Sequence, residues 1–185
     1  SCAKPIQAMP LVTSGAMDHF NFNDVELAIM CASHYGEPYH LTVLNSILKK
    51  TGLNEADLNC GDASSLSPAY ATELARSGID PRPLFNDCSG KHLGMLAYTL
   101  FQNYPIKQYI DFNGRTQTDI KSGFSQFCEY AQKNITLGID GCSAPVFALP
   151  LYHMALAYLK MSNPDLISEK KEREAANRIF DAMIN

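Results

Sequence analysis

Hydrophobic side chains recur at three- and four-residue intervals along most of this chain, and this pattern predicts a mostly helical protein. Asn23 followed by Glu26 is typical of a capping box, and it predicts a helix over Asp24–Ser33 that is too apolar for the surface. The other predicted helices are a run with Leu41, Leu44, Ile47 and Leu48 that ends at Thr51-Gly52, a helix from Pro68 to Gly78, the buried segments Gly94–Leu100 and Ala148–Lys160, and a charged final helix with the stripe Ala176, Ile179, Phe180 and Met183.

Strand signals are few. Asn134–Leu137 is short, contains β-branched side chains and is followed by glycine, so it is predicted as a single strand. The chain has no internal repeats and no linker. We therefore expect one domain over residues 1–185, with a helical body and very little sheet.

Composition narrows the class of protein. With 46% hydrophobic and 18% charged residues, the chain is typical of an ordinary globular domain. A net charge of −4 gives no basic surface for nucleic acid. The longest apolar stretch, Val146–Leu159, contains Pro150 and His153 and is shorter than the roughly 20 residues that cross a bilayer. Neither nucleic acid nor a membrane is expected as a partner.

Six cysteines are spread widely and form no C-x-x-C pair, which favours reduced thiols in a cytoplasmic protein over metal ligation or disulfides. The chain begins with Ser1 instead of Met and stops at Asn185 inside a helical pattern. These ends predict an incomplete piece of a longer protein, with N- and C-terminal parts missing, so an upstream signal peptide stays open.

Ser1 and Lys4 form the first candidate site. Three residues apart on a helix, a hydroxyl and an amine lie on one face and can meet. A lysine that is partly neutral can take the proton of a serine and activate it for acyl transfer. The pattern is common on surface helices, but the apolar residues that follow, Ile6 to Leu11, predict a buried helix here.

The second candidate is Ser33-His34, at the end of the helix that Asn23 caps. A histidine at a helix C-terminus complements the helix dipole, which is the simpler interpretation. The functional alternative is a second hydroxyl at the rim of a pocket. Taken singly, the simpler interpretation is favoured.

The third candidate, Asp87–Gly94, is a loop that runs into a helix N-terminus, where free backbone N–H groups favour an anion. It differs from a phosphate-binding loop, since Phe85 replaces the first glycine and no Ser or Thr follows Lys91. Its thiol, hydroxyl, amine and imidazole are unusually dense for a structural loop.

The fourth candidate is Gly138–Pro145, where glycines flank Asp140. Cys142, with Cys88 and either Lys91 or His92, would give zinc three ligands and leave one position open. Ligand chemistry alone favours His92. The alternative is two unrelated buried thiols.

Together the four segments resemble the Rhizobium-type L-asparaginases. The resemblance rests on Ser-x-Ala-Lys-Pro-Ile-Gln-Ala at Ser1–Ala8, Cys-Ala-Ser-His at Cys31–His34, Cys-Ser-Gly-Lys-His at Cys88–His92 and Asp-Gly-Cys at Asp140–Cys142, in order and in register. It extends over essentially all 185 residues. It implies an α/β (α+β) fold similar to serine β-lactamases and glutaminases, with a helical body beside an antiparallel sheet.

The resemblance also implies an activity and roles for residues. L-asparagine would be hydrolysed to L-aspartate and ammonia through an acyl-enzyme, and a homodimer is expected. The implied catalytic residues are Ser1, Lys4 as its base and Ser33 as a second serine whose own lysine lies beyond Asn185; the implied substrate-binding residues are His92, Asp140 and Gly141; and the implied zinc ligands are Cys88, Lys91 and Cys142. A role for the zinc ion in positioning instead of chemistry stays open.

The chain departs from the family pattern at two places. Ala63-Ser64 stands where His-Pro is usual, and only Gln117 remains of a His-Pro-x-Gln element at Gly114–Gln117. Other hypotheses are a penicillin-recognising or glutaminase-like acyl-serine hydrolase, an N-terminal nucleophile at Ser1 with its own amine as base, and an inactive zinc-binding fragment. The Ser-Asp-Asn element of penicillin-recognising proteins does not occur in the chain, and Lys-Thr-Gly occurs only as Lys50-Thr51-Gly52, at the end of a predicted helix.

Overall fold

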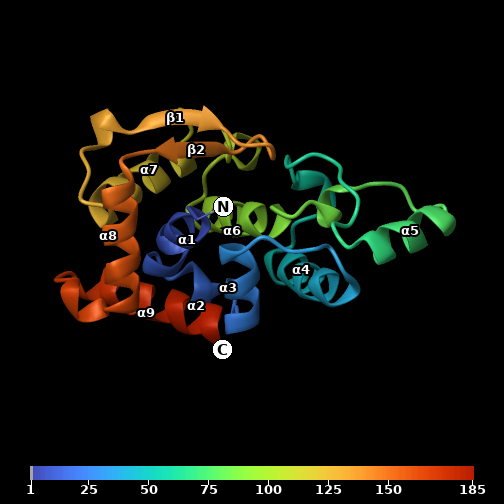
Figure 1. Cartoon of the computed structure of the whole chain (residues 1–185), viewed down its shortest axis with the longest axis horizontal. Coiled ribbons are helices and arrows are strands. Elements are labelled where there is room, and N and C mark those ends of the chain that lie inside the picture. Colours follow the sequence, from blue (N-terminus) through green and yellow to red (C-terminus); the bar gives the residue numbers. More distant parts are fainter. Residues whose placement is uncertain (1) are drawn as a thin grey trace.

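A computed structural model describes residues 2–185. Three helices, α1 (Lys4–Thr13), α3 (Asp24–Cys31) and α6 (Ser89–Phe101), pack against one another at the centre of the molecule (Figure 1). The remaining helices are α2 (Ala16–His19), α4 (Pro38–Thr51), α5 (Pro68–Arg76), α7 (Arg115–Phe127), α8 (Leu151–Ser162) and α9 (Lys170–Ile184). The mostly helical body is confirmed.

Local signals account for the ends of α3. Asn23 Oδ1 accepts from Glu26 N at 2.9 Å, and Glu26 Oε2 accepts from Asn23 N at 2.8 Å, so the predicted capping box is present. Lys50 Nζ lies 2.6 Å from the buried Glu26 carboxylate and compensates its charge. The helix ends at Cys31, two residues earlier than predicted, because Ala32 is extended. This early end frees Ala32 and Ser33 for the site described below.

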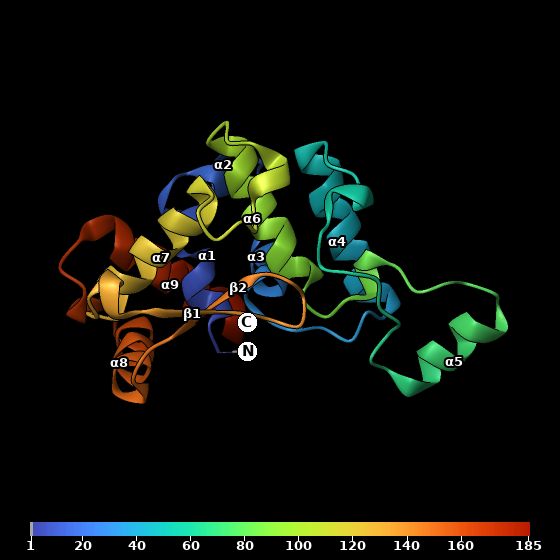
Figure 2. The same cartoon turned by 90° about the horizontal axis from the view of Figure 1, so that it is seen from above.

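Helix α4 ends as predicted, at Gly52, whose φ of 72° lies in the left-handed region that glycine tolerates best. Helix α6 begins at Ser89, five residues before the predicted segment, and is buried along nearly its whole length. Helix α5 projects from the body in both views, carried by the long connection on either side of it (Figure 2). An isolated antiparallel bridge between Ala63 and Arg82 joins the two sides of this connection.

The sheet has two antiparallel strands among the described residues, β1 (Thr136–Ile139) and β2 (Pro145–Ala148). Leu137 pairs with Phe147 and Gly138 with Val146. The predicted strand starts two residues too early, because Asn134 belongs to a short 3-10 turn. The partner strand was not predicted. The expected class, a helical body beside a small antiparallel sheet, is confirmed.

The helix predicted over Ala148–Lys160 is present as α8, but it begins three residues later than predicted and is not buried. Ala148 belongs to β2, and α8 starts only after Pro150. Leu151 and Tyr152 are 82% and 72% exposed. Apolar composition alone does not distinguish a helix buried on all sides from one with an uncovered apolar face.

The final helix α9 is amphipathic, as predicted. Ala176 and Ile179 are fully buried, Phe180 packs against the core, and Met183 is 43% exposed at the end of the stripe. No helix within residues 2–185 combines the length and the apolar character that a membrane crossing needs.

Candidate functional site

Lys4 is the most deeply buried cation of the candidate site. It opens α1, its side chain is 0% exposed, and Nζ donates to Ser33 Oγ at 2.8 Å, Ala32 O at 3.1 Å and Asp87 O at 3.3 Å. Three acceptors match the three N–H bonds of an ammonium group. Within residues 2–185, Lys4 forms no ion pair with a carboxylate. A buried amine in contact with a serine hydroxyl is the arrangement that a Ser-Lys hydrolase requires.

The predicted partner of Lys4, Ser1, lies outside the described residues. The structure therefore describes Lys4 with the second predicted serine, Ser33. Ser33 is exposed and stands at the end of a groove of about 250 Å³ between α3 and α4. The groove is lined mostly by apolar side chains, among them Val25, Ile29 and Val43. The Ser33 hydroxyl thus joins a buried amine to an open surface.

The N-terminus of α6 brings the third candidate segment next to Lys4. Cys88 is the N-cap residue, and Asn86 Oδ1 accepts from its backbone N–H at 3.0 Å. Gly90 permits this approach, since a Cβ there would lie 2.1 Å from Ile29 O in α3. A small cavity of about 10 Å³ is lined in part by Lys4, Gln7 and Lys91.

The β1–β2 turn brings the fourth candidate segment to the same place. One ligand atom each of Cys88, Asp140 and Cys142 lies within 4.8 Å of the others, and Lys91 Nζ lies 3.0 Å from Asp140 Oδ2. Cys88, Cys142 and Lys91 are buried, whereas the Asp140 side chain is 30% exposed. Four candidate residues that are up to 54 positions apart therefore form one cluster.

The donor set of this cluster fits zinc. Two thiolates with a nitrogen or carboxylate ligand are typical of a tetrahedral zinc site with one open position. Cys142 is held as the thiolate, because its interaction with the Cys88 thiol lowers its pKa despite burial, and the pKa of Cys88 is raised in return. The pair shares one proton.

Lys91 carries a positive charge in this cluster. Burial lowers its pKa, but the charges of Cys142 and Cys88 and the hydrogen bond to Asp140 outweigh burial, and the net effect raises the pKa. Burial raises the pKa of Asp140, but Lys91 and the Gly141 N–H outweigh it and lower the pKa. As a zinc ligand Lys91 would have to lose a proton first.

His92 directly follows Lys91 in α6, and Tyr109 holds its ring. It is 0% exposed, and its Nδ1 lies 2.7 Å from Tyr109 OH, which itself accepts from Asn59 N at 2.7 Å. Tyr109 therefore donates to Nδ1, and the proton of the neutral ring is on Nε2. Burial lowers the pKa of His92, against the raising influence of Cys142. Nε2 has no hydrogen-bond partner within residues 2–185.

Sequence reasoning did not find the partners that hold these groups. Tyr109 fixes the tautomer of His92, and Ser89 bonds His34 with 2.8 Å between Oγ and Nε2. His34 and Ser89 are 55 positions apart, so no spacing rule could have joined them. The prediction that His92, Asp140 and Gly141 contact substrate stays a prediction.

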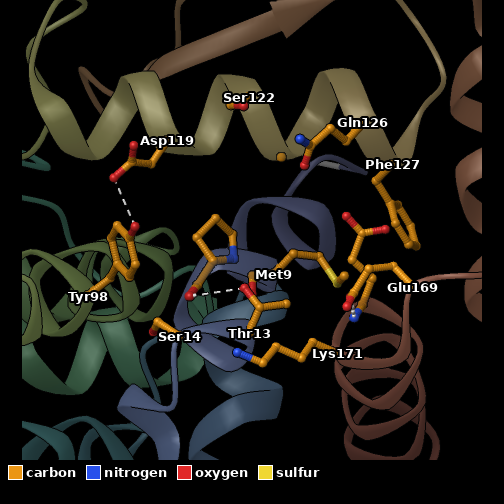
Figure 3. Close-up of a pocket in the computed structure, with 13 residues that line it drawn as sticks. Met9, Thr13, Ser14, Tyr98, Asp119, Ser122, Gln126, Phe127, Glu169 and Lys171 are labelled. Carbon is orange, nitrogen blue, oxygen red and sulfur yellow. Dashed lines mark hydrogen bonds between the residues drawn. The ribbon is translucent and has the colours of Figure 1, made fainter.

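Another cavity, of about 560 Å³, is lined by residues of α1, α7 and the start of α9 (Figure 3). Tyr98 OH donates to Asp119 at its edge, and Glu169 and Lys171 also line it. Of the predicted site residues that lie within 2–185, none lines this cavity. The candidate chemistry is therefore concentrated at the α1–α3–α6 junction and the β1–β2 turn.

A buried amine beside a serine hydroxyl, in a helical body with a small antiparallel sheet, is the arrangement expected of an amide hydrolase that works by acyl transfer. The comparison with known families agrees with this class: a family described as L-asparaginase II matches residues 1–185. A search of curated proteins found no match. The chain belongs to the L-asparaginase II family, hydrolases that act on the amide of a small molecule, L-asparagine.

Proposed function

We propose that this protein hydrolyses L-asparagine to L-aspartate and ammonia through an acyl-enzyme on a serine. The observation that carries the proposal is the 2.8 Å contact between the Nζ of the buried Lys4 and the Oγ of the exposed Ser33. The family match over the whole chain supports the reaction class.

In the proposed mechanism, Lys4 acts as both the general base and the general acid. Serine attacks the side-chain amide carbon, Lys4 in its neutral form takes the hydroxyl proton, and the same proton passes to the leaving nitrogen, which departs as ammonia. Water then attacks the ester carbon, Lys4 takes a proton from that water, and it passes this proton to the serine oxygen as the ester bond breaks and L-aspartate is released. Ser1 keeps the role of nucleophile that the family resemblance implies, and Ser33, which contacts Lys4, orients its amine and relays protons.

The Cys88–Lys91–Asp140–Cys142 cluster is the proposed binding end of the site. Cys88, Lys91 and Cys142 would hold zinc, which would supply a fixed positive charge for a carboxylate or carbonyl oxygen of the substrate. Asp140 is part-exposed, with Oδ2 accepting from Lys91 and Oδ1 from Gly141 N–H, so it orients this ligand, and the remaining lone pairs of its carboxylate would accept from the α-amino group of an amino acid. His92 and Gly141 complete the proposed substrate contacts.

An ammonia-release assay with three variants tests the proposal. We expect Ser1→Ala and Lys4→Met to lower kcat by about 10³-fold or more, and Ser33→Ala by a smaller factor, with intact mass spectrometry showing an acyl adduct in the parent protein. Leu151→Ala, on the exposed face of α8, is the matched control and should keep full activity. Unchanged turnover in both Ser1→Ala and Lys4→Met would overturn the proposal, and faster release from L-glutamine would redirect the substrate.

We also propose a cytoplasmic homodimer. The support for the compartment is that the six cysteines are free thiols, five of them buried. Light scattering on the purified protein tests the dimer, and a monomeric mass at all concentrations would contradict it.

A further inference from the structure

His34 is a buried histidine with no assigned role, one residue after the site serine Ser33. Its side chain is 2% exposed, and both ring nitrogens are bonded. Gly36 N donates to Nδ1 at 3.0 Å, so Nδ1 is the acceptor and the ring proton is on Nε2. Nε2 then donates to Ser89 Oγ at 2.8 Å. One neutral tautomer satisfies every contact.

Ser89 continues the same chain of hydrogen bonds into the start of α6. Its hydroxyl is fully buried, accepts from His34 and donates to Leu84 O at 3.4 Å. Its backbone N–H is bonded to Asn86 O at 2.9 Å. Ser89 therefore fixes the turn that presents Cys88, its neighbour in the chain.

A backbone hydrogen bond also joins the segment that contains His34 to the residues just before α6. His34 N donates to Asp87 O at 3.3 Å, and Lys4 Nζ donates to that same oxygen at 3.3 Å. The two segments also approach each other closely, since a Cβ at Gly36 would lie 3.0 Å from Phe85 O. The segments 32–36 and 85–89 are thus joined by a ring, a backbone bond and a close contact.

We propose that His34 is a positioning residue that clamps the Ser33 turn onto the N-terminus of α6, and so keeps the Lys4–Ser33 pair in a fixed relation to the Cys88–Lys91–Cys142 cluster. This inference rests on the proposed function for its consequence in turnover. The clamp itself is defined by the contacts of His34 with Ser89, Gly36 and Asp87.

The neutral state that the clamp needs is maintained by the surroundings of the ring. Burial lowers the pKa of His34 to about 4, the charges of His40 and Lys4 act in the same direction, and Asp87 opposes them. Protonation would place a hydrogen on Nδ1 against the Gly36 N–H. At neutral pH the hydrogen-bond directions are therefore fixed.

Two substitutions of His34 by amide side chains distinguish a clamp from a side chain that only fills space. His34→Gln keeps an N–H donor near the position of Nε2, and His34→Asn keeps an acceptor near Nδ1 but loses the bond to Ser89. Zinc affinity is measured by competition with a chromophoric chelator, and the rate at which iodoacetamide alkylates Cys88 in metal-free protein is measured by peptide mass spectrometry. His153→Gln and His153→Asn are the matched controls, since within residues 2–185 the His153 ring, in α8, bonds only Cys128 O, at 2.9 Å.

We expect His34→Asn and Ser89→Ala each to weaken zinc binding and to speed Cys88 alkylation by roughly tenfold, with kcat falling and KM nearly unchanged. His34→Gln should stay within about threefold of the parent protein, and the double variant that combines His34→Asn with Ser89→Ala should be no worse than either single variant. Equal behaviour of His34→Asn and His34→Gln, or additive losses in the double variant, would overturn the clamp. A parent protein that binds zinc but releases no ammonia would contradict the proposed function alone, and one that binds no zinc still leaves the alkylation rates to judge the clamp.

Discussion

Two regions contribute different halves of the candidate site. One is the junction of α1, α3 and α6, and the other is the hairpin of β1 and β2 together with α8, which follows it. Lys4, Cys88 and Lys91 come from helices that are buried on nearly all sides. Asp140 and Cys142 come from a turn between two short strands whose neighbouring helix exposes Leu151.

The difference shows how the site divides its tasks. A proton-transfer pair works only if its atoms stay within hydrogen-bond distance, and the packed junction supplies that constraint. A ligand-binding cluster must admit a molecule from outside, and the part-exposed turn supplies access. Changes in the junction should therefore affect stability and geometry together, whereas changes in the hairpin should affect binding with little effect on stability.

Substitutions at two glycines, one in the junction and one in the hairpin, should show the largest difference in the free energy of unfolding. Gly90→Ala places a Cβ 2.1 Å from Ile29 O, a backbone atom, and we expect a loss of at least about 3 kcal/mol in the free energy of unfolding. Gly141→Ala in the hairpin meets nothing within 4 Å and should change it by less than about 0.5 kcal/mol. Urea unfolding of both variants makes the measurement. Equal losses would show that the turn is as constrained as the junction.

Two aliphatic side chains of similar size extend the comparison. Ile6 in α1 is fully buried, and Ile6→Ala should cost about 2–5 kcal/mol in the free energy of unfolding through lost burial and a cavity. Leu151→Ala, at a side chain that is 82% exposed, should cost less than about 0.5 kcal/mol. Thermal unfolding provides the comparison. A large loss at Leu151 would mean that α8 is covered in solution, as a homodimer contact would require.

Acid should weaken the junction through His34. The pKa of this group is about 4 in the folded protein and 6.5 in the unfolded chain, so below pH 6.5 the unfolded state binds more protons. The free energy of unfolding therefore falls as the pH drops from about 6.5 towards 4, by about 3 kcal/mol from this group. His34→Gln should remove that part of the pH dependence in urea titrations at about pH 7, 6, 5 and 4. An unchanged slope in this variant would show that His34 is not the responsible group.

The parts of the fold that were predicted correctly depend on signals between residues only a few positions apart. The capping box at Asn23 and the glycine end of α4 lie within a few positions of their partners, and both are confirmed. The exposed face of α8 was not predicted, because an apolar segment of this length does not reveal which neighbours cover it. The second strand was missed because Pro145 opens it, and proline is unusual inside strands.

The candidate site shows the same limit. Each of its four motifs was visible in the sequence as a candidate, but their assembly depends on contacts such as the one between Lys91 and Asp140, 49 positions apart. The resemblance to a family brought the motifs together. The clamp of His34 on Ser89 is carried by no local pattern, and only the packing of α3 against α6 reveals it.

The pH dependence of zinc binding would sharpen the comparison at the cluster, where both regions meet. Without metal, Lys91 is charged and Cys88 is protonated, because the pKa of each is raised, whereas Cys142 is already a thiolate. Binding through Cys88, Lys91 and Cys142 must displace two protons. Zinc affinity should then rise by about two powers of ten per pH unit between about pH 6 and 8, because tighter binding accompanies proton loss.

The same titration of two variants decides which region supplies the third ligand. Lys91→Met removes one displaced proton, so the slope should fall to about one power of ten per pH unit, about 1.4 kcal/mol less in binding free energy for each unit. Asp140→Asn should keep the slope near two and weaken binding by roughly tenfold, through the lost hydrogen bond to Lys91. The opposite result, a slope near one in the parent protein that Lys91→Met leaves unchanged, would assign the third position to Asp140. The hairpin would then supply two of the three ligands, and the junction would contribute Cys88 alone.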